Sequence, residues 1–371
     1  MADTFQRNEK EGNVVKVVVG MSGGVDSSVA VALLKEKGYE VSGVTMKIWD
    51  GKNSSEEGRR HGCYGPGEQE DLEDAQKVAY TLGINFYVFD LRHEYKTEVL
   101  DYFNQEYLSG RTPNPCLRCN RKIKFDALLK KTQDSGLKFD YFATGHYARI
   151  EYDKNKHRYL LKKAKDLDKD QSYFISSLSQ KQLSRSLFPL GNYTKKTVRT
   201  LASDFGLAVD NKPESQDFIT GGYSSITEAA QPGPILDNQE NFLGEHKGIP
   251  FYTIGQRKGL GISAKEPLYV IDIDQEKNTI IVGTKKEVYR DELIASNLNW
   301  IAIEELKRPI RIKARIRHLH QEAEAIVTPL NEDKVYVKFR ESQMAITPGQ
   351  AVVFYHGEVV VGGGTIERIR E

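Results

Sequence analysis

A glycine-rich stretch near the beginning of the chain constrains the fold more than any other feature of the sequence. It reads Val17-Val-Val-Gly-Met-Ser-Gly-Gly-Val-Asp-Ser-Ser28, so a β-branched apolar run passes into a glycine loop and then into a helical pattern. This order predicts a β-strand, a tight loop and the N-terminus of a helix. Because the amides and the positive dipole end of a helix N-terminus favour an anion, the stretch predicts a phosphate-binding site at the end of a strand.

The spacing within this loop excludes two common nucleotide-binding motifs. The loop lacks the lysine of the Gly-x-x-x-x-Gly-Lys-Ser/Thr motif, and it lacks the Gly-x-Gly-x-x-Gly spacing of dinucleotide-binding folds. The segment Ser22–Ser27 instead resembles the PP-loop of the ATP pyrophosphatase superfamily. The resemblance implies that the loop holds the β- and γ-phosphates of ATP as a pyrophosphate leaving group, and that the acceptor becomes adenylated at the α-phosphate.

Composition and charge limit the class of protein. A chain of 371 residues exceeds one ordinary core, so we expect two or three domains. Neither a membrane-length apolar run nor a signal-peptide core is present in the sequence, which predicts a cytoplasmic location and no membrane partner. With a formal net charge of only +1, nucleic-acid binding has to come from local basic patches. Residues 118–124 form such a patch, and we expect Lys122 and Lys124 to contact RNA phosphates.

Strand and helix patterns alternate through the first half of the chain. We expect helices over residues 28–37, 68–82, 94–108 and 195–205, strands over 39–47, 86–90 and 139–148, a long loop over 49–67, and a hairpin over 148–153 and 159–163. Such alternation predicts an α/β fold with a doubly wound parallel sheet, whose ligands lie at the carboxyl ends of the strands. The PP-loop resemblance implies a sheet of the adenine nucleotide α-hydrolase-like type.

The composition and the periodicity of the sequence change from about residue 221. Glycine and proline cluster, helical periodicity disappears, and short alternating runs follow at 269–273, 279–282, 310–317, 323–328, 334–339, 351–355 and 359–363. These runs predict a small central β domain and a C-terminal β-barrel. The expected domains are a PP-loop ATP-binding catalytic domain over residues 12–222, the central β domain over 223–287, and the C-terminal β-barrel over 288–371.

The second informative stretch holds a Cys-x-x-Cys motif, Cys116 and Cys119, directly after Asn114-Pro115. Its neighbouring cations are expected to lower the thiol pKa values. Spacing alone leaves a metal site and a redox pair open. Cys63 lies on a loop after a predicted strand and brings a third thiol toward the same edge of the sheet. Three cysteines in such a chain do not form a disulfide framework, so we expect reactive or metal-bound thiols.

Six blocks of sequence together resemble the tRNA-specific 2-thiouridylase family. They are Gly20-Met-Ser-Gly-Gly-Val-Asp-Ser27, Thr112-Pro-Asn-Pro-Cys-x-x-Cys-Asn120, Ala143-Thr-Gly-His-Tyr147, Lys169-Asp-Gln-Ser-Tyr-Phe174, Gly255-Gln-Arg-Lys-Gly-Leu-Gly-Ile262 and Thr347-Pro-Gly-Gln350. The blocks run in order along essentially the whole chain.

The resemblance implies a sulfurtransferase that uses ATP and Mg²⁺. It implies adenylation of O2 of the wobble uridine, position 34 in the anticodon stem-loop of tRNA, followed by replacement of AMP by sulfur from a donor protein or a sulfide source. The implied nucleotide site comprises Gly20, Met21, Ser22, Gly23, Gly24, Val25, Asp26, Ser27, Met46 and Gly145. The implied tRNA contacts are Asn114, Pro115, Cys116, Lys169, Asp170, Gln171 and Arg317. Cys119 is the implied nucleophile, with Cys116 and Asp26 as the other catalytic residues.

One departure from the family pattern concerns sulfur. Much of the family carries a second, persulfide-bearing cysteine, but the corresponding segment here, Pro213-Glu-Ser-Gln-Asp-Phe-Ile-Thr220, contains none. Many relatives also have aspartate at the position of Cys116. We therefore infer that Cys63, Cys116 and Cys119 hold a 4Fe–4S cluster whose fourth iron binds sulfide. A disulfide cycle between Cys119 and Cys116, and a zinc site of His61 with the three cysteines, remain open.

Two other functions account for parts of the sequence. Another PP-loop ligase or amidotransferase, such as an argininosuccinate- or NAD-synthetase-like enzyme, does not need the Cys-x-x-Cys motif and its basic surroundings. A non-catalytic RNA-binding protein with a metal or a cluster leaves Asp26 and the phosphate loop unexplained. Release of pyrophosphate and AMP that requires both tRNA and a sulfur source distinguishes the thiolating enzyme from both.

Overall fold

The computed structural model describes residues 14–51, 62–207, 217–219 and 230–367. The chain divides into two compact units, each described by itself below. The first comprises Met1–Glu98, Cys116–Gly221 and Glu358–Val360, and the second comprises Val99–Pro115, Gly222–Gly357 and Val361–Glu371. In the described ranges, no helix is both long enough and apolar enough to cross a membrane.

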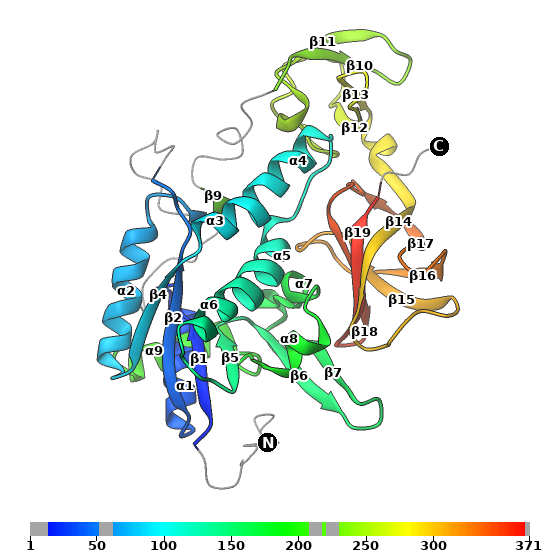
Figure 1. Cartoon of the computed structure of the whole chain (residues 1–371). Coiled ribbons are helices and arrows are strands. Elements are labelled where there is room, and N and C mark those ends of the chain that lie inside the picture. Colours follow the sequence, from blue (N-terminus) through cyan, green and yellow to red (C-terminus); the bar gives the residue numbers. More distant parts are fainter. Residues whose placement is uncertain (1–13, 52–61, 208–216, 220–229, 368–371) are drawn as a thin grey trace. The chain divides into compact units, whose positions relative to one another are not determined.

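A five-stranded sheet lies at the centre of the first unit, in the order β4-β2-β1-β5-β8 (Figure 1). Its strands are β1 (Lys16–Gly20), β2 (Glu40–Lys47), β4 (Asn85–Asp90), β5 (Tyr141–Thr144) and β8 (Ser186–Leu187). Every neighbouring pair is parallel. The predicted doubly wound α/β sheet is thus confirmed, and the β-branched run Val17–Val19 forms its buried middle strand.

Helices cover both faces of this sheet. They include α1 (Val25–Glu36), α2 (Glu68–Thr81), α9 (Lys195–Asp204), α5 (Pro115–Cys119), the π-helix η2 (Asn120–Ala127) and α6 (Leu128–Asp134). On one face Val17 and Val19 share a buried cluster with residues of α1, α2 and α9. On the other face Phe125 of η2 packs edge-on against Phe142 of β5, with ring centroids 5.2 Å apart. Two covered faces explain why the strands read as continuous apolar runs.

Several local predictions in this unit are confirmed. Thr194 caps α9, since its hydroxyl accepts a hydrogen bond of 3.2 Å from the amide of Thr197. The predicted hairpin is formed by β6 (Ala148–Asp153) and β7 (Arg158–Lys163). The helix predicted over 94–108, whose residues belong partly to each unit, is divided into α3 (Arg92–Tyr95), the π-helix η1 (Lys96–Asp101) and α4 (Tyr102–Leu108). Shorter helices are η3 (Leu167–Lys169), α7 (Ser172–Ile175) and α8 (Gln180–Ser184).

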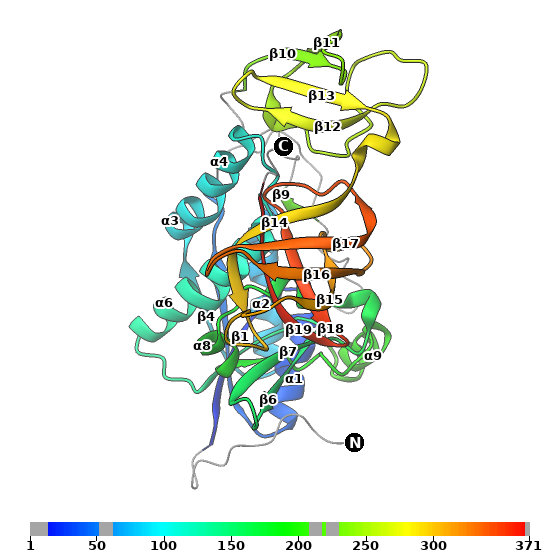
Figure 2. The same cartoon turned by 90° about the vertical axis from the view of Figure 1, so that its right-hand side faces the viewer.

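The second unit contains two β structures, as the sequence predicts (Figure 2). A four-stranded sheet has the order β11-β10-β13-β12, with β10 (Gly233–Leu236), β11 (Phe242–His246), β12 (Tyr269–Asp274) and β13 (Thr279–Gly283). A barrel follows, built from β14 (Tyr289–Trp300), β15 (Ile310–Arg315), β16 (Ala323–Pro329), β17 (Val335–Met344), β18 (Ala351–His356) and β19 (Val359–Ile366). Pairing of β14 with β19 closes it. The 3-10 helices η5 (Ile249–Phe251) and η6 (Lys285–Val288) lie between these strands.

The strand β14 was not among the predicted runs. Its outer positions are charged or polar, and its burial does not alternate regularly, so the sequence carries no clear period of two. Its place in the barrel depends on pairing with both β17 and β19.

Candidate functional site

The PP-loop joins the carboxyl end of β1 to the first turn of α1. Gly24 precedes the helix in an extended conformation, and no side chain caps this helix start. The Ser27 hydroxyl accepts a hydrogen bond of 3.2 Å from the amide of Ser22 and donates one of 3.2 Å to the carbonyl of Gly24. The loop is therefore held by its own serine, and the helix N-terminus is presented without a side-chain cap, as an anion site requires.

Two glycines allow close packing around the loop. Gly23 has φ +70°, and a Cβ atom there would lie 2.3 Å from the carbonyl oxygen of Asp71 in α2. Gly145 follows β5, and a Cβ atom there would lie 2.7 Å from the backbone nitrogen of Ser27. Any side chain at either position would displace the loop. Packing on both sides thus fixes the backbone that would surround a phosphate.

Asp26, in the first turn of α1, is the centre of a polar network. The Lys195 ammonium lies 2.8 Å from both carboxylate oxygens of Asp26, and the Tyr147 hydroxyl donates a hydrogen bond of 2.8 Å to Oδ1. Gln171 holds the backbone of Tyr147 through two hydrogen bonds. The backbone N–H of Tyr147 donates to Oε1 of Gln171 at 3.0 Å, and the backbone N–H of Gln171 donates to the carbonyl of Tyr147 at 2.9 Å. Lys195 is not among the site residues predicted from the sequence. A lysine in the first turn of a helix opposes the helix dipole, and this was the available signal.

The structure brings the three thiols together in the first unit. Cys116 and Cys119 lie in α5, and Cys63 lies in β3 (Gly62–Tyr64), which pairs in parallel with β9 (Asp217–Ile219). Burial is the largest cause that raises the pKa of Cys116, and the charges of Cys63 and Cys119 raise it further. Electrostatic coupling of this kind requires short distances.

Aromatic stacking positions Cys63 within this group. The neighbouring Tyr64 ring stacks on the Tyr95 ring of α3, with centroids 5.6 Å apart and an angle of 5° between the planes. The Tyr64 hydroxyl donates a hydrogen bond of 3.1 Å to Asp50. Tyr95 is buried, and burial together with the charges of the three thiols raises its pKa well above the usual range. Tyr95 therefore lies beside the thiols and anchors the strand that carries Cys63.

The expected lowering of the thiol pKa values is wrong. Burial raises the pKa of Cys119 to about 11 and that of Cys116 to about 12, although the Lys124 ammonium acts in the opposite direction. Desolvation outweighs the attraction because the charged form loses its water. Arg118, a second expected cation, is bound to Glu98 at 2.7 Å. Both thiols of the Cys-x-x-Cys motif are thus protonated at neutral pH.

Lys124, which the sequence predicts to contact RNA phosphates, instead lies among the thiols. Burial lowers its pKa, but the charges of Cys119, Cys63 and Cys116 raise it and prevail. Lys124 also helps to lower the pKa of His146 to about 3, although burial is the larger cause. The pattern Lys-Ile-Lys resembles a solvated basic face, and only the fold shows that one of its lysines lies beside the thiols.

His146 connects the thiols to the PP-loop. It follows β5, and its Nδ1 shares a hydrogen bond of 2.7 Å with the hydroxyl of Thr144. Its ring packs against Phe125 and Phe188, with centroid distances of 6.1 and 5.9 Å. The preceding residue, Gly145, is the one in close contact with the PP-loop. The thiols and the loop therefore share one region at the carboxyl ends of the strands.

The arrangement of donors does not fit a metal site. Across the residues that the structure describes, no group of three or more His, Cys, Asp and Glu side chains is arranged to hold a metal ion. The inferred iron–sulfur cluster and the zinc alternative thus find no support there, and no step is derived through either. His61 and most of Pro213–Thr220 lie outside the described residues.

Three of the side chains implied to touch tRNA hold the protein's own backbone. Asp170 is 3% exposed and accepts hydrogen bonds from the amides of Ala164 and Ser172 and from the Ser172 hydroxyl, at 3.0, 3.2 and 2.8 Å. Gln171 holds Tyr147. Arg317 donates to the carbonyl of Ile254 at 3.1 Å and to the hydroxyl of Thr347. The implied tRNA contacts, including Asn114 and Pro115 beside α5, stay predictions.

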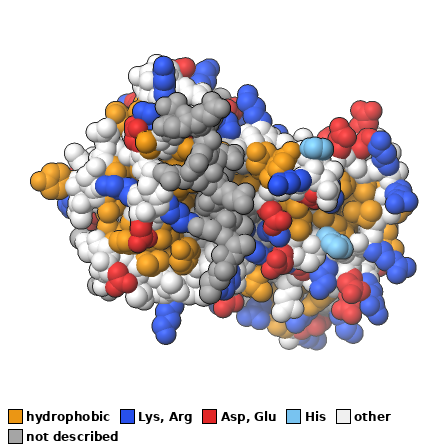
Figure 3. Space-filling view, turned by 90° about the horizontal axis from the view of Figure 1, so that it is seen from below, with side chains coloured by type: hydrophobic (Ala, Val, Ile, Leu, Met, Phe, Trp, Pro, Cys, Tyr) orange, Lys and Arg blue, Asp and Glu red, His pale blue; other side chains and the backbone are white. Residues whose placement is uncertain are grey.

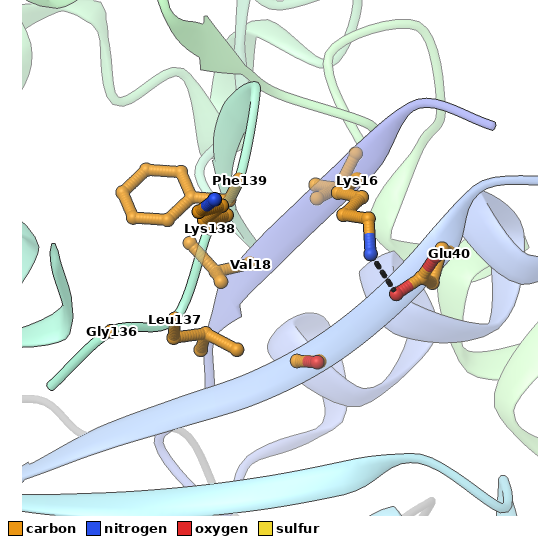
Figure 4. A pocket seen from close by; sticks show the side chains of 9 residues that line it. Lys16, Val18, Glu40, Gly136, Leu137, Lys138 and Phe139 are labelled. Carbon is orange, nitrogen blue, oxygen red and sulfur yellow. Dashed lines mark hydrogen bonds and ion pairs between the residues drawn. The ribbon is translucent and has the colours of Figure 1, made fainter. Parts of the chain in front are cut away.

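In the part of the chain that the structure describes, the face drawn in Figure 3 and one cavity do not indicate a competing site. On the face drawn in Figure 3, positive and negative side chains are interspersed, as the small net charge predicts. A cavity of about 280 Å³ is lined by residues including Lys16, Val18, Glu40 and Phe139 (Figure 4). It lies where β1 begins, whereas the PP-loop follows the residue where β1 ends. The implied adenosine contact Met46 is half-buried near the carboxyl end of β2.

Comparisons with known proteins match nearly the whole length of the chain. Three family models match in order: a tRNA methyl transferase HUP domain at residues 15–220, a tRNA methyl transferase PRC-barrel domain at 224–284, and an aminomethyltransferase beta-barrel domain at 290–366. A tRNA-specific 2-thiouridylase, MnmA 2, of Caldanaerobacter subterraneus subsp. tengcongensis is 51% identical over 361 residues, 95% of this chain and 98% of the relative. MnmA of Halothermothrix orenii, with the same description, is 49% identical over 95% of this chain and 99% of its own length.

The family models and the similar proteins are named after different reactions. The family-model names refer to methyl transfer, whereas the curated relatives are described as 2-thiouridylases. Methyl transfer has no use for a loop that binds a pyrophosphate leaving group. The PP-loop and the clustered thiols therefore agree with the relatives.

Proposed function

The chain belongs to the tRNA-specific 2-thiouridylase family, and from this premise we propose that it thiolates C2 of the wobble uridine, position 34, of tRNA in an ATP-dependent reaction. The observation that carries the proposal is a series of neighbouring interactions. The thiols and His146 each interact electrostatically with Lys124, and Gly145, next to His146, packs against the PP-loop. An enzyme that first adenylates a base and then attacks it with sulfur needs both groups within reach of one substrate atom. A ligase for small molecules does not need the thiols.

The first step is adenylation. Uridine O2 forms a bond to the α-phosphorus of ATP, and the bond from that phosphorus to pyrophosphate breaks. The uncapped start of α1 and the loop amides hold the leaving pyrophosphate, and the Ser27 hydrogen bonds fix the loop. The residues present fit a Mg²⁺ ion together with ATP, because Asp26 offers a partly exposed carboxylate beside the phosphate loop. When bound, Mg²⁺ supplies charge neutralisation for the departing pyrophosphate.

The second step is sulfur transfer by the thiols. We assign the terminal sulfur of a persulfide on Cys119 as the nucleophile. The Cys119 thiolate forms this persulfide by attacking the outer sulfur of a persulfide on a donor protein, whose cysteine thiolate leaves. It attacks C2, and the C2–O bond to AMP breaks. Cys116 then attacks the sulfur of Cys119, which releases the 2-thiouridine and leaves a disulfide that an external dithiol reduces. A persulfide is more acidic than a thiol, so it ionises in surroundings that keep Cys119 itself protonated.

The domain boundaries and the location belong to the same proposal. We assign catalysis to residues 12–222, the central β domain to 223–287 and further tRNA contacts to the barrel at 288–371. The matched family models, with gaps near 221–223 and 285–289, support this division. Cytoplasmic tRNA is the substrate pool that we assign to the enzyme.

The test measures AMP and pyrophosphate together with 2-thiouridine in the recovered tRNA. We expect AMP and pyrophosphate only when ATP, Mg²⁺ and tRNA are present, and 2-thiouridine only when a sulfur source is added. Nucleotide cleavage that proceeds with a small amine or amino acid in place of tRNA would favour a PP-loop ligase. Tight tRNA binding with no ATP cleavage under any condition would favour a binding protein.

A further inference from the structure

We propose that Lys195 is the cation that binds the pyrophosphate leaving group, and that Asp26 holds it beside the PP-loop until the nucleotide arrives. The proposal rests on the proposed adenylation, and it adds a binding residue from a helix far along the chain. Asp26 and Lys195 are 169 positions apart in sequence.

The geometry places the Lys195 ammonium against the loop. Its Nζ lies 2.8 Å from both Asp26 oxygens and 5.8 Å from the centre of the Tyr147 ring. The side chain of Lys195 is 11% exposed, and that of Asp26 is 31% exposed. A lysine held by a carboxylate and an aromatic face in a half-buried site has lost most of its conformational freedom. The ammonium therefore has one defined position, beside the first turn of α1.

The position of Lys195 in its own helix argues for a role outside that helix. It is the first residue of α9, where the dipole favours anions and disfavours a cation. The helix start is instead served by Thr194 and by Asp166, whose Oδ2 accepts the Lys195 amide at 2.8 Å. The backbone of Lys195 thus completes α9, while its side chain belongs to the PP-loop.

The charges of Asp26 and Lys195 explain why a cation is needed beside the PP-loop. Asp26 places a negative charge in the same helical turn that would receive a polyphosphate, and two like charges a few ångströms apart repel each other. Lys195 neutralises Asp26 in the absence of ligand. When Asp26 turns to a divalent cation, the ammonium remains next to the anion. Its three donors and compact charge suit phosphate oxygens.

The test is the binding of inorganic pyrophosphate to the whole protein, measured by calorimetry with EDTA and again with Mg²⁺. We expect K195M to bind pyrophosphate roughly 10- to 100-fold more weakly in both buffers, the range for loss of one charge-assisted hydrogen bond. K195R should recover at least half of that loss on a logarithmic scale. The matched control is K196M, which removes an exposed lysine from the same turn of α9 and should change the affinity by less than about twofold.

A double variant separates binding from mere neutralisation of Asp26. In EDTA, D26N should bind pyrophosphate more tightly than the wild type, because it removes a repelling charge. If Lys195 contacts the anion, D26N/K195M should bind roughly 10-fold more weakly than D26N. Equal affinities of D26N and D26N/K195M would overturn the proposal, and so would wild-type affinity in a folded K195M. If K195M does not fold, the comparison of D26N with D26N/K195M still tests the proposal, because neither of these variants leaves Asp26 as an unpaired charge.

The outcome is independent of the proposed thiolation. Pyrophosphate binding that depends on Lys195, without tRNA-dependent release of AMP, would refute the thiolation and leave the role of Lys195 intact. Normal thiolation with unchanged pyrophosphate binding in K195M would refute the role of Lys195 alone.

Discussion

Gly145 and Ser27 are packed so closely that a Cβ atom on Gly145 would lie 2.7 Å from the backbone nitrogen of Ser27. The turn after β5 and the start of α1 therefore meet backbone to backbone. Because His146 follows this glycine directly, the contact also fixes the distance between the phosphate loop and the thiol region.

Replacing Gly145 by alanine should displace the PP-loop. We expect G145A to lose about 1–3 kcal/mol in its free energy of unfolding, as for other overpacked sites, and to bind ATP at least 10-fold more weakly. Chemical denaturation and calorimetry with Mg²⁺ and ATP measure the two effects. The control is G67A, since a Cβ atom at Gly67 meets nothing within 4 Å. Unchanged ATP affinity in G145A would show that the contact does not shape the nucleotide site.

Ser27→Ala should separate nucleotide chemistry from tRNA binding. The substitution removes the hydrogen bonds to Ser22 and Gly24, so the loop loses its internal support. We expect tRNA-dependent pyrophosphate release to fall at least 10-fold, while the tRNA dissociation constant stays within about twofold. Release near the wild-type rate would mean that the loop is misassigned.

Cys116 and Cys119 should matter for sulfur transfer and not for adenylation. We expect Cys119→Ser and Cys116→Ser to abolish 2-thiouridine while pyrophosphate release continues, because the thiols act after adenylation. Cys63→Ser tests whether the third thiol of the group takes part. Iron and acid-labile sulfide, measured in anaerobically purified protein, test the earlier inference of a cluster. Stoichiometric iron that is lost in every cysteine variant would contradict the persulfide route and restore that inference.

His146 should make the protein less stable in acid. Burial and Lys124 lower its pKa from 6.5 to about 3, so in this range the unfolded chain binds a proton that the folded chain does not. Stability is therefore lost as the pH falls from about 6.5 toward 3, with a slope of up to about 1.4 kcal/mol per pH unit from this group. His146→Gln cannot take up the proton and should flatten the slope, as urea unfolding between pH 4.5 and 6.5 would measure. An unchanged slope would place the ring in water.

The two lysines of the basic patch should behave differently toward tRNA. Both are half-buried, and Lys124 interacts with the thiols. We expect Lys122→Ala to reduce the slope of log affinity against log salt by about 1, the release of one counterion. Lys124→Ala should leave that slope unchanged and should slow alkylation of Cys119 at pH 8, since the thiolate loses a nearby cation. A reduced salt slope in the Lys124 variant would restore it to the RNA-binding surface.

The sequence by itself determined the features that depend on neighbouring residues. The β-branched run before a glycine loop fixed the strand, the loop and the start of α1, and Thr194 marked the beginning of α9 through a hydrogen bond three residues away. Alternation of apolar residues was enough for most strands of the barrel. These signals are local, because periodicity, capping and turn geometry are set within a few positions of the chain.

Only the tertiary structure decided which side chains meet and which lose their water. Lys195 reaches Asp26 from 169 positions away, and no local pattern encodes that ion pair. Lys122 and Lys124 look equivalent in sequence and both are half-buried, yet only the fold shows that Lys124 lies beside the thiols. The thiol pKa values rise for the same reason: cations nearby in sequence predict a lowered pKa, but the free-energy cost of burying a charge depends on packing, which the folded chain alone supplies.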